Sequence, residues 1–270
     1  MKNYSNFSEL VNANKIWAIG SLHSSLASFQ SIKKYILSNF ELNDKLIFLG
    51  NIIGFGDNSK ETINEVLQLR LNLMAKYKLK TTDIIFLRGA QEEMLSKLLQ
   101  LHIAPNPIEI LDWIFSHGVD KTIISYNFDP DEFRKIVTQG TININKLTTK
   151  LNNQISYCPG HKEFFSNLKH AAYTDTKKVL FVNRGVDISR PLSAQNDCFW
   201  WGYQSFSKIN KPYFSFKRIV RGYQSNILNN IESAKSNVLC TLFKQPLHNK
   251  KILAGIFAKN GDILELFESK

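Results

Sequence analysis

The chain has 270 residues, of which 43% are hydrophobic, 21% charged and 12% aromatic. These proportions exclude disorder on the scale of a domain, and the length suits one α/β domain, so we expect a single domain over residues 1–270. The formal net charge of +11 attracts anions of many kinds without identifying one.

Three features of the sequence limit the compartment and the partners. Residues 1–12 lack the apolar core of a secretory signal, and no apolar run is long enough for a membrane span, so we expect a cytoplasmic protein that does not bind membranes. Cys158, Cys198 and Cys240 form no C-x-x-C pair, which favours free thiols in a reducing compartment. No segment combines dense basic residues with interleaved aromatics, so nucleic acid is not an expected partner.

The first third of the chain alternates strands with helices. Lys15–Gly20, Lys45–Gly50 and Asp83–Arg88 are short apolar runs typical of buried strands. Apolar residues with a helical period follow the first strand, and a helix around Glu92–Leu101 follows the third strand. This β-α-β-α-β order predicts parallel strands joined by right-handed crossovers. The apolar face of the first helix consists of Leu26, Phe29, Ile32, Ile36 and Phe40.

The helix between the second and third strands has its own start signal. Ser59 is a suitable N-cap, and Glu61 in the first turn suits the positive end of the helix dipole. The spacing predicts a buried face that consists of Ile63, Val66, Leu67 and Leu71.

The rest of the chain changes character twice. Residues 105–156 are helical but interrupted by prolines, and strands then resume. We expect the last three strands to be antiparallel, because Asn260-Gly261 is a strong hairpin signal. A parallel first half and an antiparallel second half predict a two-sheet α/β (α+β) sandwich. The expected later strands are Lys178–Val182, Phe216–Val220, Val238–Phe243, Ile252–Ala258 and Ile263–Phe267.

The loops after the strands carry the functional signal, because open α/β sheets bind ligands at the carboxyl ends of their strands. They read G-S-L-H-S from Gly20, G-N-I-I-G-F-G from Gly50, R-G-A-Q-E from Arg88, N-R-G from Asn183 and R-G-Y from Arg221. In this order they resemble the G-D-I-H-G, G-D-x-x-D-R-G, R-G-N-H-E, V-H-A-G and H-G-H motifs of the calcineurin-like metallophosphoesterases, in particular the bacterial serine/threonine phosphatase and dinucleoside-tetraphosphatase branch.

The resemblance covers residues 15–267, with 105–156 as a helical insertion. Framework residues outside the motifs match as well, such as F-L-R-G followed by E-E-M-L over 86–95, and S-R-P-L over 189–192. The resemblance implies a four-layer α-β-β-α sandwich with two mixed β-sheets.

The departures from the family fall where its chemistry lies. The resemblance implies two divalent metals, such as manganese, iron or zinc, and among the six ligand positions only the histidine keeps its type. The position of the catalytic acid is Gln91, that of its carboxylate partner is Gly54, and that of a phosphate-gripping arginine is Phe55. The six ligand positions are Ser21, His23, Asn51, Ala90, Asn183 and Tyr223.

These replacements remove the charge that such chemistry requires. Two neighbouring divalent cations need anionic ligands, above all a bridging carboxylate, whereas Ser21 and Asn51 are neutral. Gln91 has no titratable proton for a leaving group. We therefore expect a degenerate, inactive member without a metal cofactor, a pseudophosphatase with a binding or regulatory role.

Two alternatives remain open at this stage. Asp57, Glu92 and His161 are available to rebuild a metal site, which would leave an active phosphoesterase for phosphoproteins or dinucleoside polyphosphates. The aromatic-rich stretch 199–214 would instead suit a structural subunit that exposes an apolar surface.

Three arginines suggest what the emptied site binds. Arg88, Arg184 and Arg221 lie in the strand-end loops, and guanidinium groups hold phosphate directly with a forked geometry. A phosphorylated ligand or partner protein is therefore the expected partner. The competing interpretation is that these arginines pair with carboxylates such as Glu92 or Asp187.

Overall fold

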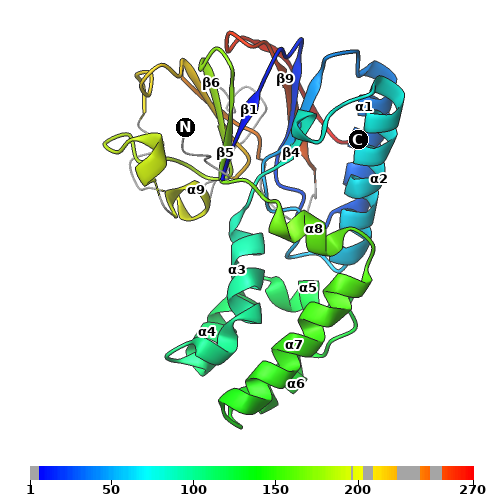
Figure 1. Cartoon of the computed structure of the whole chain (residues 1–270), viewed down its shortest axis with the longest axis vertical. Coiled ribbons are helices and arrows are strands. Elements are labelled where there is room, and N and C mark those ends of the chain that lie inside the picture. The colour runs from blue at the N-terminus through cyan, green and yellow to red at the C-terminus, as the bar shows by residue number, and fades with distance from the viewer. Residues whose placement is uncertain (1–5, 196, 203–208, 224–237, 244–250) are drawn as a thin grey trace.

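The computed structural model describes residues 6–195, 197–202, 209–223, 238–243 and 251–270. Two mixed β-sheets pack face to face in this part of the chain (Figure 1). The strand order is β1-β5-β6-β7-β8 in the first sheet and β10-β9-β2-β3-β4 in the second. The strands are β1 (Phe7–Leu10), β2 (Ile16–Ile19), β3 (Lys45–Phe48), β4 (Ile84–Phe86), β5 (Ala171–Thr174), β6 (Val179–Val182), β7 (Arg218–Arg221), β8 (Leu239–Thr241), β9 (Leu253–Phe257) and β10 (Ile263–Glu268).

Helices cover the second sheet and extend below it. Figure 1 shows α1 and α2 beside this sheet, while α4–α7 form an arm that points away from the sandwich. Short 3-10 turns lie at 81–83, 101–103 and 192–194. The helices are α1 (Leu26–Asn39), α2 (Ser59–Tyr77), α3 (Ala90–Leu99), α4 (Pro107–Ser116), α5 (Val119–Ser125), α6 (Pro130–Val137), α7 (Thr141–Tyr157), α8 (His161–Ser166) and α9 (Cys198–Trp201).

Strand alternation divides the core into layers. In β2, every residue is buried. Ile16 and Ala18 pack between the two sheets, while Trp17 and Ile19 pack against the helices. A strand with apolar residues on both faces is stable only when both faces are covered, so β2 requires the sandwich on one side and α1 on the other. The two mixed sheets confirm the predicted fold class.

Most predicted elements lie where the sequence placed them. The parallel pairs β2–β3 and β3–β4 are confirmed, and so is the β9–β10 hairpin, where Gly261 has a φ of +95°. The predicted antiparallel second half was wrong at two pairs: β7 pairs in parallel with β6 and with β8. Two strands, β1 and β5, were not predicted. Each has only four residues, and in β1 only Leu10 is buried, so β1 has no strong apolar pattern.

The prediction for α2 needs two corrections. The helix begins at Ser59, with Asn58 at the N-cap. The Ser59 hydroxyl instead forms buried hydrogen bonds with the hydroxyls of Ser24 (2.6 Å) and Thr122 (3.1 Å). Leu71 was wrongly assigned to the core, since it lies on the opposite helix face from Val66 and is exposed. The buried apolar residues of α2 are Ile63, Val66, Leu69 and Leu73.

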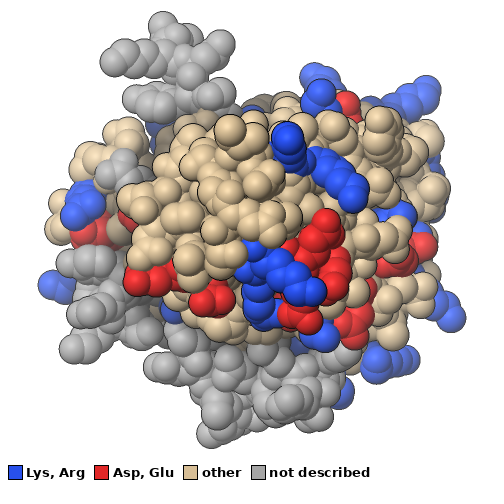
Figure 2. Space-filling model, turned by 90° about the horizontal axis from the view of Figure 1, so that it is seen from below, with Lys and Arg blue, Asp and Glu red and all other residues tan. Residues whose placement is uncertain are grey.

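The described surface bears on three earlier expectations. No helix of the described ranges is both long and apolar enough to cross a membrane. Figure 2 shows basic and acidic side chains interleaved on the face seen from below, without a continuous basic patch on that face. In the aromatic-rich stretch, Phe199, Trp200 and Tyr213 are buried, whereas Phe214 is exposed. Residues 203–208 of this stretch lie outside the described residues.

Candidate functional site

Backbone hydrogen bonds join the loops that follow four strands. After β2, the N–H groups of Leu22 and His23 donate to the carbonyl of Asn51 at 3.0 and 2.9 Å. The Ser21 N–H donates to the Gly222 carbonyl at 3.1 Å, and the Gly222 N–H donates to the Asn183 carbonyl at 2.9 Å. The loops after β2, β3, β6 and β7 therefore meet at one place, as the family resemblance predicts.

The side chains of Ser21, Asn51 and Asn183, three of the six ligand positions, form further hydrogen bonds between these loops. The Asn51 amide nitrogen donates to the Ser21 hydroxyl at 3.2 Å, and that hydroxyl donates to the Gly222 carbonyl at 2.9 Å. The Asn51 amide oxygen accepts the Gln91 N–H at 3.1 Å. The Asn183 amide nitrogen donates to the Leu49 carbonyl at 2.6 Å. Neutral side chains thus use their polar atoms to connect the loops to one another.

Gln91 lies against Gly54, the position that the resemblance assigns to the carboxylate partner of the catalytic acid. Its amide nitrogen donates to the His117 carbonyl at 2.9 Å. Its amide oxygen lies against Gly54, where an added Cβ would be only 2.0 Å away. Gly54 also has a φ of +88°, which side chains rarely adopt. The glycine and the glutamine therefore fit each other, and an aspartate at position 54 would not fit beside Gln91.

An aromatic cluster surrounds His23. The rings of Phe55, Tyr223 and Phe243 lie edge-on to the imidazole, with centroid distances of 5.2, 5.6 and 6.0 Å. Neither imidazole nitrogen has a hydrogen-bond partner among the described residues. Burial lowers the pKa of His23 to about 3, although the Ile53 backbone opposes this effect, so the imidazole is neutral at pH 7.

The backbone of these loops is strained. His23, Ser24, Asn51 and Phe55 all have positive φ values, between 46° and 59°. This left-handed conformation is costly for residues other than glycine and asparagine, and it persists only where surrounding contacts enforce it. Such clustering is typical of functional loops, and here the hydrogen bonds between loops hold it in place.

Glu92 supplies the strongest of these contacts. Its buried carboxylate accepts the N–H groups of Asn51 (2.9 Å), Ile52 (2.7 Å) and Gly89 (2.8 Å), with a longer contact to the N–H of Ile53 (3.4 Å). Burial raises the pKa of Glu92, while these hydrogen bonds lower it. Because both oxygens already accept backbone N–H groups, the carboxylate is committed to holding the loops.

The other residues proposed to rebuild a metal site have separate partners. Asp57 is exposed and pairs with Lys121 at 3.4 Å. His161 is buried and hydrogen-bonds through its ring nitrogens to Tyr126 (2.6 Å) and Asn64 (2.9 Å). No described contact joins either residue to Glu92, so the described contacts do not support the rebuilt metal site.

The donor atoms at the ligand positions do not fit two divalent metals. Ser21 and Asn51 are committed to hydrogen bonds, Ala90 has no donor, and Tyr223 packs against Phe243 with its centroid 4.5 Å away. Among the six ligand positions, His23 and the amide oxygen of Asn183 have buried acceptors for which the described residues supply no hydrogen-bond partner, and the amide oxygen of the neighbouring Gln91 is a further one. No group of three or more His, Cys, Asp or Glu residues that could hold a metal occurs among the described residues. One imidazole and one amide provide no counter-charge for a pair of cations.

Two of the three arginines lie together. Arg184 lies over the Tyr223 ring, 5.4 Å from its centroid, and it is close enough to Arg221 for the two positive charges to interact. Arg221 is buried and donates from Nε to the Thr241 hydroxyl at 2.8 Å. Burial, and then the neighbouring charge of Arg184, lower the pKa of Arg221 to about 10, so it stays protonated at pH 7.

Arg88 has different surroundings. It pairs with Glu93 at 2.9 Å and lies 5.9 Å from the centroid of the Trp200 ring. The competing interpretation named Glu92 and Asp187 as examples of carboxylate partners, but Glu92 accepts backbone N–H groups and Asp187 pairs with Arg190 at 3.1 Å.

Solved structures resemble the whole chain. A protein assigned as a diadenosine tetraphosphatase superimposes with a TM-score of 0.55 at 12% identity, over 99% of both chains. A serine/threonine phosphatase from Saccharomyces cerevisiae gives a TM-score of 0.50 at 14% identity, over 98% of this chain and 84% of the other. The chain has the calcineurin-like phosphoesterase fold. No protein-family model matches the sequence, and no curated protein matches it.

Some contributors to this phosphoesterase-like site were not predicted. Phe243 follows β8, and the rule that functional residues follow strand ends would have found it. The carbonyls of Gly222 and His117 also complete the site. Backbone atoms leave no residue-type signal, so sequence patterns cannot reveal them.

The first prediction concerns Glu92. In Glu92→Gln, the amide NH₂ would face backbone N–H donors that now meet a carboxylate oxygen. We expect the free energy of unfolding to fall by about 2 kcal/mol, because buried donors lose their acceptor. Urea denaturation measures the change. Glu93→Gln is the matched control, because Glu93 pairs with the part-exposed Arg88, and its replacement should cost well under half as much. Equal losses in the two variants would refute this role for Glu92.

The second prediction concerns pH. In the unfolded chain, His23 binds a proton below about pH 6.5, whereas in the folded chain it does so only near pH 3. Between these two pKa values, the unfolded chain binds more protons than the folded chain. The free energy of unfolding therefore falls as the pH falls through this range. In His23→Phe, we expect stability between pH 6 and pH 4 to depend less on pH, by up to about 1.4 kcal/mol per pH unit.

Urea melts at several pH values measure this slope. Phe55→Leu disturbs the same aromatic cluster without removing a titratable group, so it should keep the wild-type slope. An unchanged slope in His23→Phe would mean that the imidazole is not buried in its neutral form.

Proposed function

We propose that this protein is a degenerate metallophosphoesterase that does not hydrolyse phosphate esters and acts by binding a phosphorylated ligand without metal. The observation that carries the first half is the way the ligand positions are used. Ser21 and Asn51 hydrogen-bond to the loops, and Tyr223 packs in the aromatic cluster around His23. A metal-bound hydroxide needs a cation to lower the pKa of water, and these side chains offer no anionic ligand for one.

The loss of general-acid catalysis supports the same proposal. The family position of the catalytic acid holds Gln91, whose amide is hydrogen-bonded to the His117 carbonyl. An amide cannot deliver a proton to a leaving alkoxide. The position of its carboxylate partner is Gly54, where the Gln91 side chain occupies the space that a Cβ would take. Three separate parts of the reaction therefore lack their chemical groups.

The arginines support the second half of the proposal. Arg184 and Arg221 bring two positive charges close together, and the charge of Arg184 contributes to the lowered pKa of the buried Arg221. A phosphate dianion would offset both charges, and guanidinium groups bind phosphate with two parallel hydrogen bonds. Arg88 is the third candidate, although Glu93 already offsets its charge. The expected ligand is a phosphate group on a nucleotide or a phosphorylated peptide, in the cytoplasm.

The third prediction tests catalysis. Purified protein with added manganese should hydrolyse p-nitrophenyl phosphate and diadenosine tetraphosphate no faster than protein treated with chelator. The reason is that none of the six family ligand positions holds an anionic side chain. Turnover that depends on manganese and disappears on chelation would instead support an active phosphoesterase with an altered centre.

The fourth prediction tests binding. Calorimetric titration in the presence of chelator should detect binding of inorganic phosphate, adenosine diphosphate or a phosphoserine peptide. Arg184→Ala and Arg221→Gln should each lower the affinity for the probe by about tenfold, or ~1.4 kcal/mol. Arg134→Ala is the control, since Arg134 lies on the arm and pairs with the exposed Asp131. The proposal fails if no probe binds the wild type, or if the site variants bind as well as the control.

A further inference from the structure

A second candidate site lies away from the strand-end loops, on the outer side of the first sheet. It is an open groove of about 290 Å³. One wall is the segment Pro191–Ser193, the other is the turn Phe214–Phe216, and Phe7 and Tyr173 form the floor. None of these residues belongs to the aromatic cluster or to the three arginines. We call it the outer groove.

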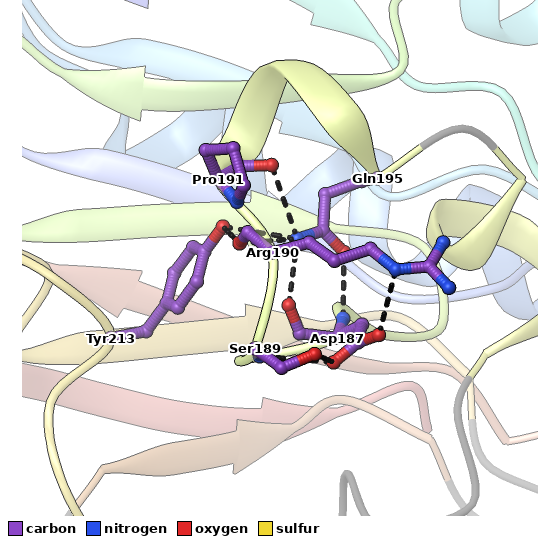
Figure 3. A network of polar contacts seen from close by, with 6 residues as sticks. All are labelled: Asp187, Ser189, Arg190, Pro191, Gln195 and Tyr213. Carbon is purple, nitrogen blue, oxygen red and sulfur yellow. Dashed lines mark hydrogen bonds and ion pairs between the residues drawn. The ribbon is translucent and has the colours of Figure 1, made fainter.

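Both walls of the outer groove are held by one hydrogen-bond network (Figure 3). The buried Gln195 donates from Nε2 to the carbonyls of Asp187 (2.8 Å) and Arg190 (3.0 Å) and to the Tyr213 hydroxyl (3.0 Å). Its Oε1 accepts the Asp187 N–H at 2.6 Å. The Tyr213 hydroxyl donates to the Arg190 carbonyl at 2.7 Å. This network joins Arg190 to Tyr213, the chain neighbours of the two walls, and so holds the walls at a fixed separation.

The network holds an exposed aromatic ring in a strained conformation. Phe214 has a φ of +51° and is 69% exposed. It lies in a tight turn closed by the hydrogen bonds Tyr213 N–H to Phe216 carbonyl (3.2 Å) and Phe216 N–H to Tyr213 carbonyl (2.9 Å). Both the left-handed backbone and the exposed ring are unfavourable for the free protein. The strained turn therefore holds this ring beside the groove, where a bound partner would cover it.

The rim of the groove favours an acidic partner. Lys177 lines the groove and lies in a left-handed turn, with a φ of +52°. No carboxylate lies within ion-pair distance of its ammonium group among the described residues. The chain as a whole carries a net charge of +11. A second copy of this chain would bring the same excess of positive charge, whereas an acidic segment would be attracted.

We propose that the outer groove binds a peptide segment of an acidic partner protein, which inserts a bulky apolar side chain beside Phe214 and places a carboxylate opposite Lys177. The volume suits one or two side chains, and the open shape suits an extended chain that continues beyond the groove. Such a segment would cover the Phe214 ring and pair the ammonium group. The proposal does not depend on phosphate binding by Arg184 and Arg221.

A random peptide library displayed on phage, selected against the wild-type protein, tests this proposal. We expect the enriched peptides to combine a bulky apolar residue with Asp or Glu. Fluorescence anisotropy then measures the affinity of the strongest labelled peptide for Phe214→Ala and for Lys177→Glu. Each substitution should weaken binding by about tenfold. The two variants probe different contacts, so Lys177→Glu still tests the groove if Phe214→Ala folds poorly.

Two matched controls lie elsewhere on the surface. Ile142→Ala removes another exposed apolar side chain, on α7, and Lys78→Glu reverses another exposed lysine with a positive φ. Both should bind the peptide as the wild type does. The proposal is overturned if no peptide is enriched, if the enriched peptides lack acidic residues, or if the groove variants bind like the controls. Sedimentation that shows a dimer dissociated by Phe214→Asp would also overturn it, because the occupant would then be a second copy.

Discussion

The hydrogen bonds accepted by the Glu92 carboxylate are the interaction on which the candidate site depends. Glu92 lies in the first turn of α3 and reaches across to the loop after β3, where it accepts N–H groups from Asn51 and Ile52. A carboxylate at a helix N-terminus is favoured by the helix dipole, and the backbone donors repay much of the cost of its burial. The left-handed backbone at Asn51 is stable because this contact enforces it.

The replacements in the neighbouring loops form a mutually consistent set. The Asn51 amide donates to the Ser21 hydroxyl and accepts the Gln91 backbone N–H. The Gln91 side chain occupies space beside residue 54 that is free because this residue is glycine. Phe55 and the loop around Tyr223 bring aromatic rings against His23, which is neutral for that reason. Hydrogen bonds and ring packing therefore connect loops that metal ions would connect in a phosphoesterase. Under the proposed function, this arrangement preserves the fold without the charged groups of the phosphoesterase reaction.

Much of the fold was predictable because its strands and helices are strongly apolar. The runs at Lys15–Gly20 and Lys45–Gly50 are buried on both faces, and such runs leave a clear signal in sequence. β1 was missed because most of it is only partly buried, and the orientation of β8 was wrong because local patterns do not encode pairing between distant strands. The single-domain assignment stays a prediction.

The candidate site was predictable to the level of positions but not of contacts. The order of the loops identified Ser21, His23 and Asn51 as neighbours, because strand ends of parallel sheets meet. The sequence alone could not show that the Gln91 oxygen lies against Gly54, since packing between two loops depends on three-dimensional distances. The pairing of Arg88 with Glu93 rather than Glu92 had the same cause: adjacent residues of α3 point to different faces.

Metal analysis of the purified protein tests the central claim most directly. The protein would be incubated with manganese, iron or zinc, freed of unbound metal by gel filtration, and measured by plasma mass spectrometry. Our account predicts a metal content well below one equivalent per chain, because Ser21 and Asn51 provide no counter-charge. One or two tightly held equivalents per chain, removed by chelator and lost in His23→Phe, would contradict it.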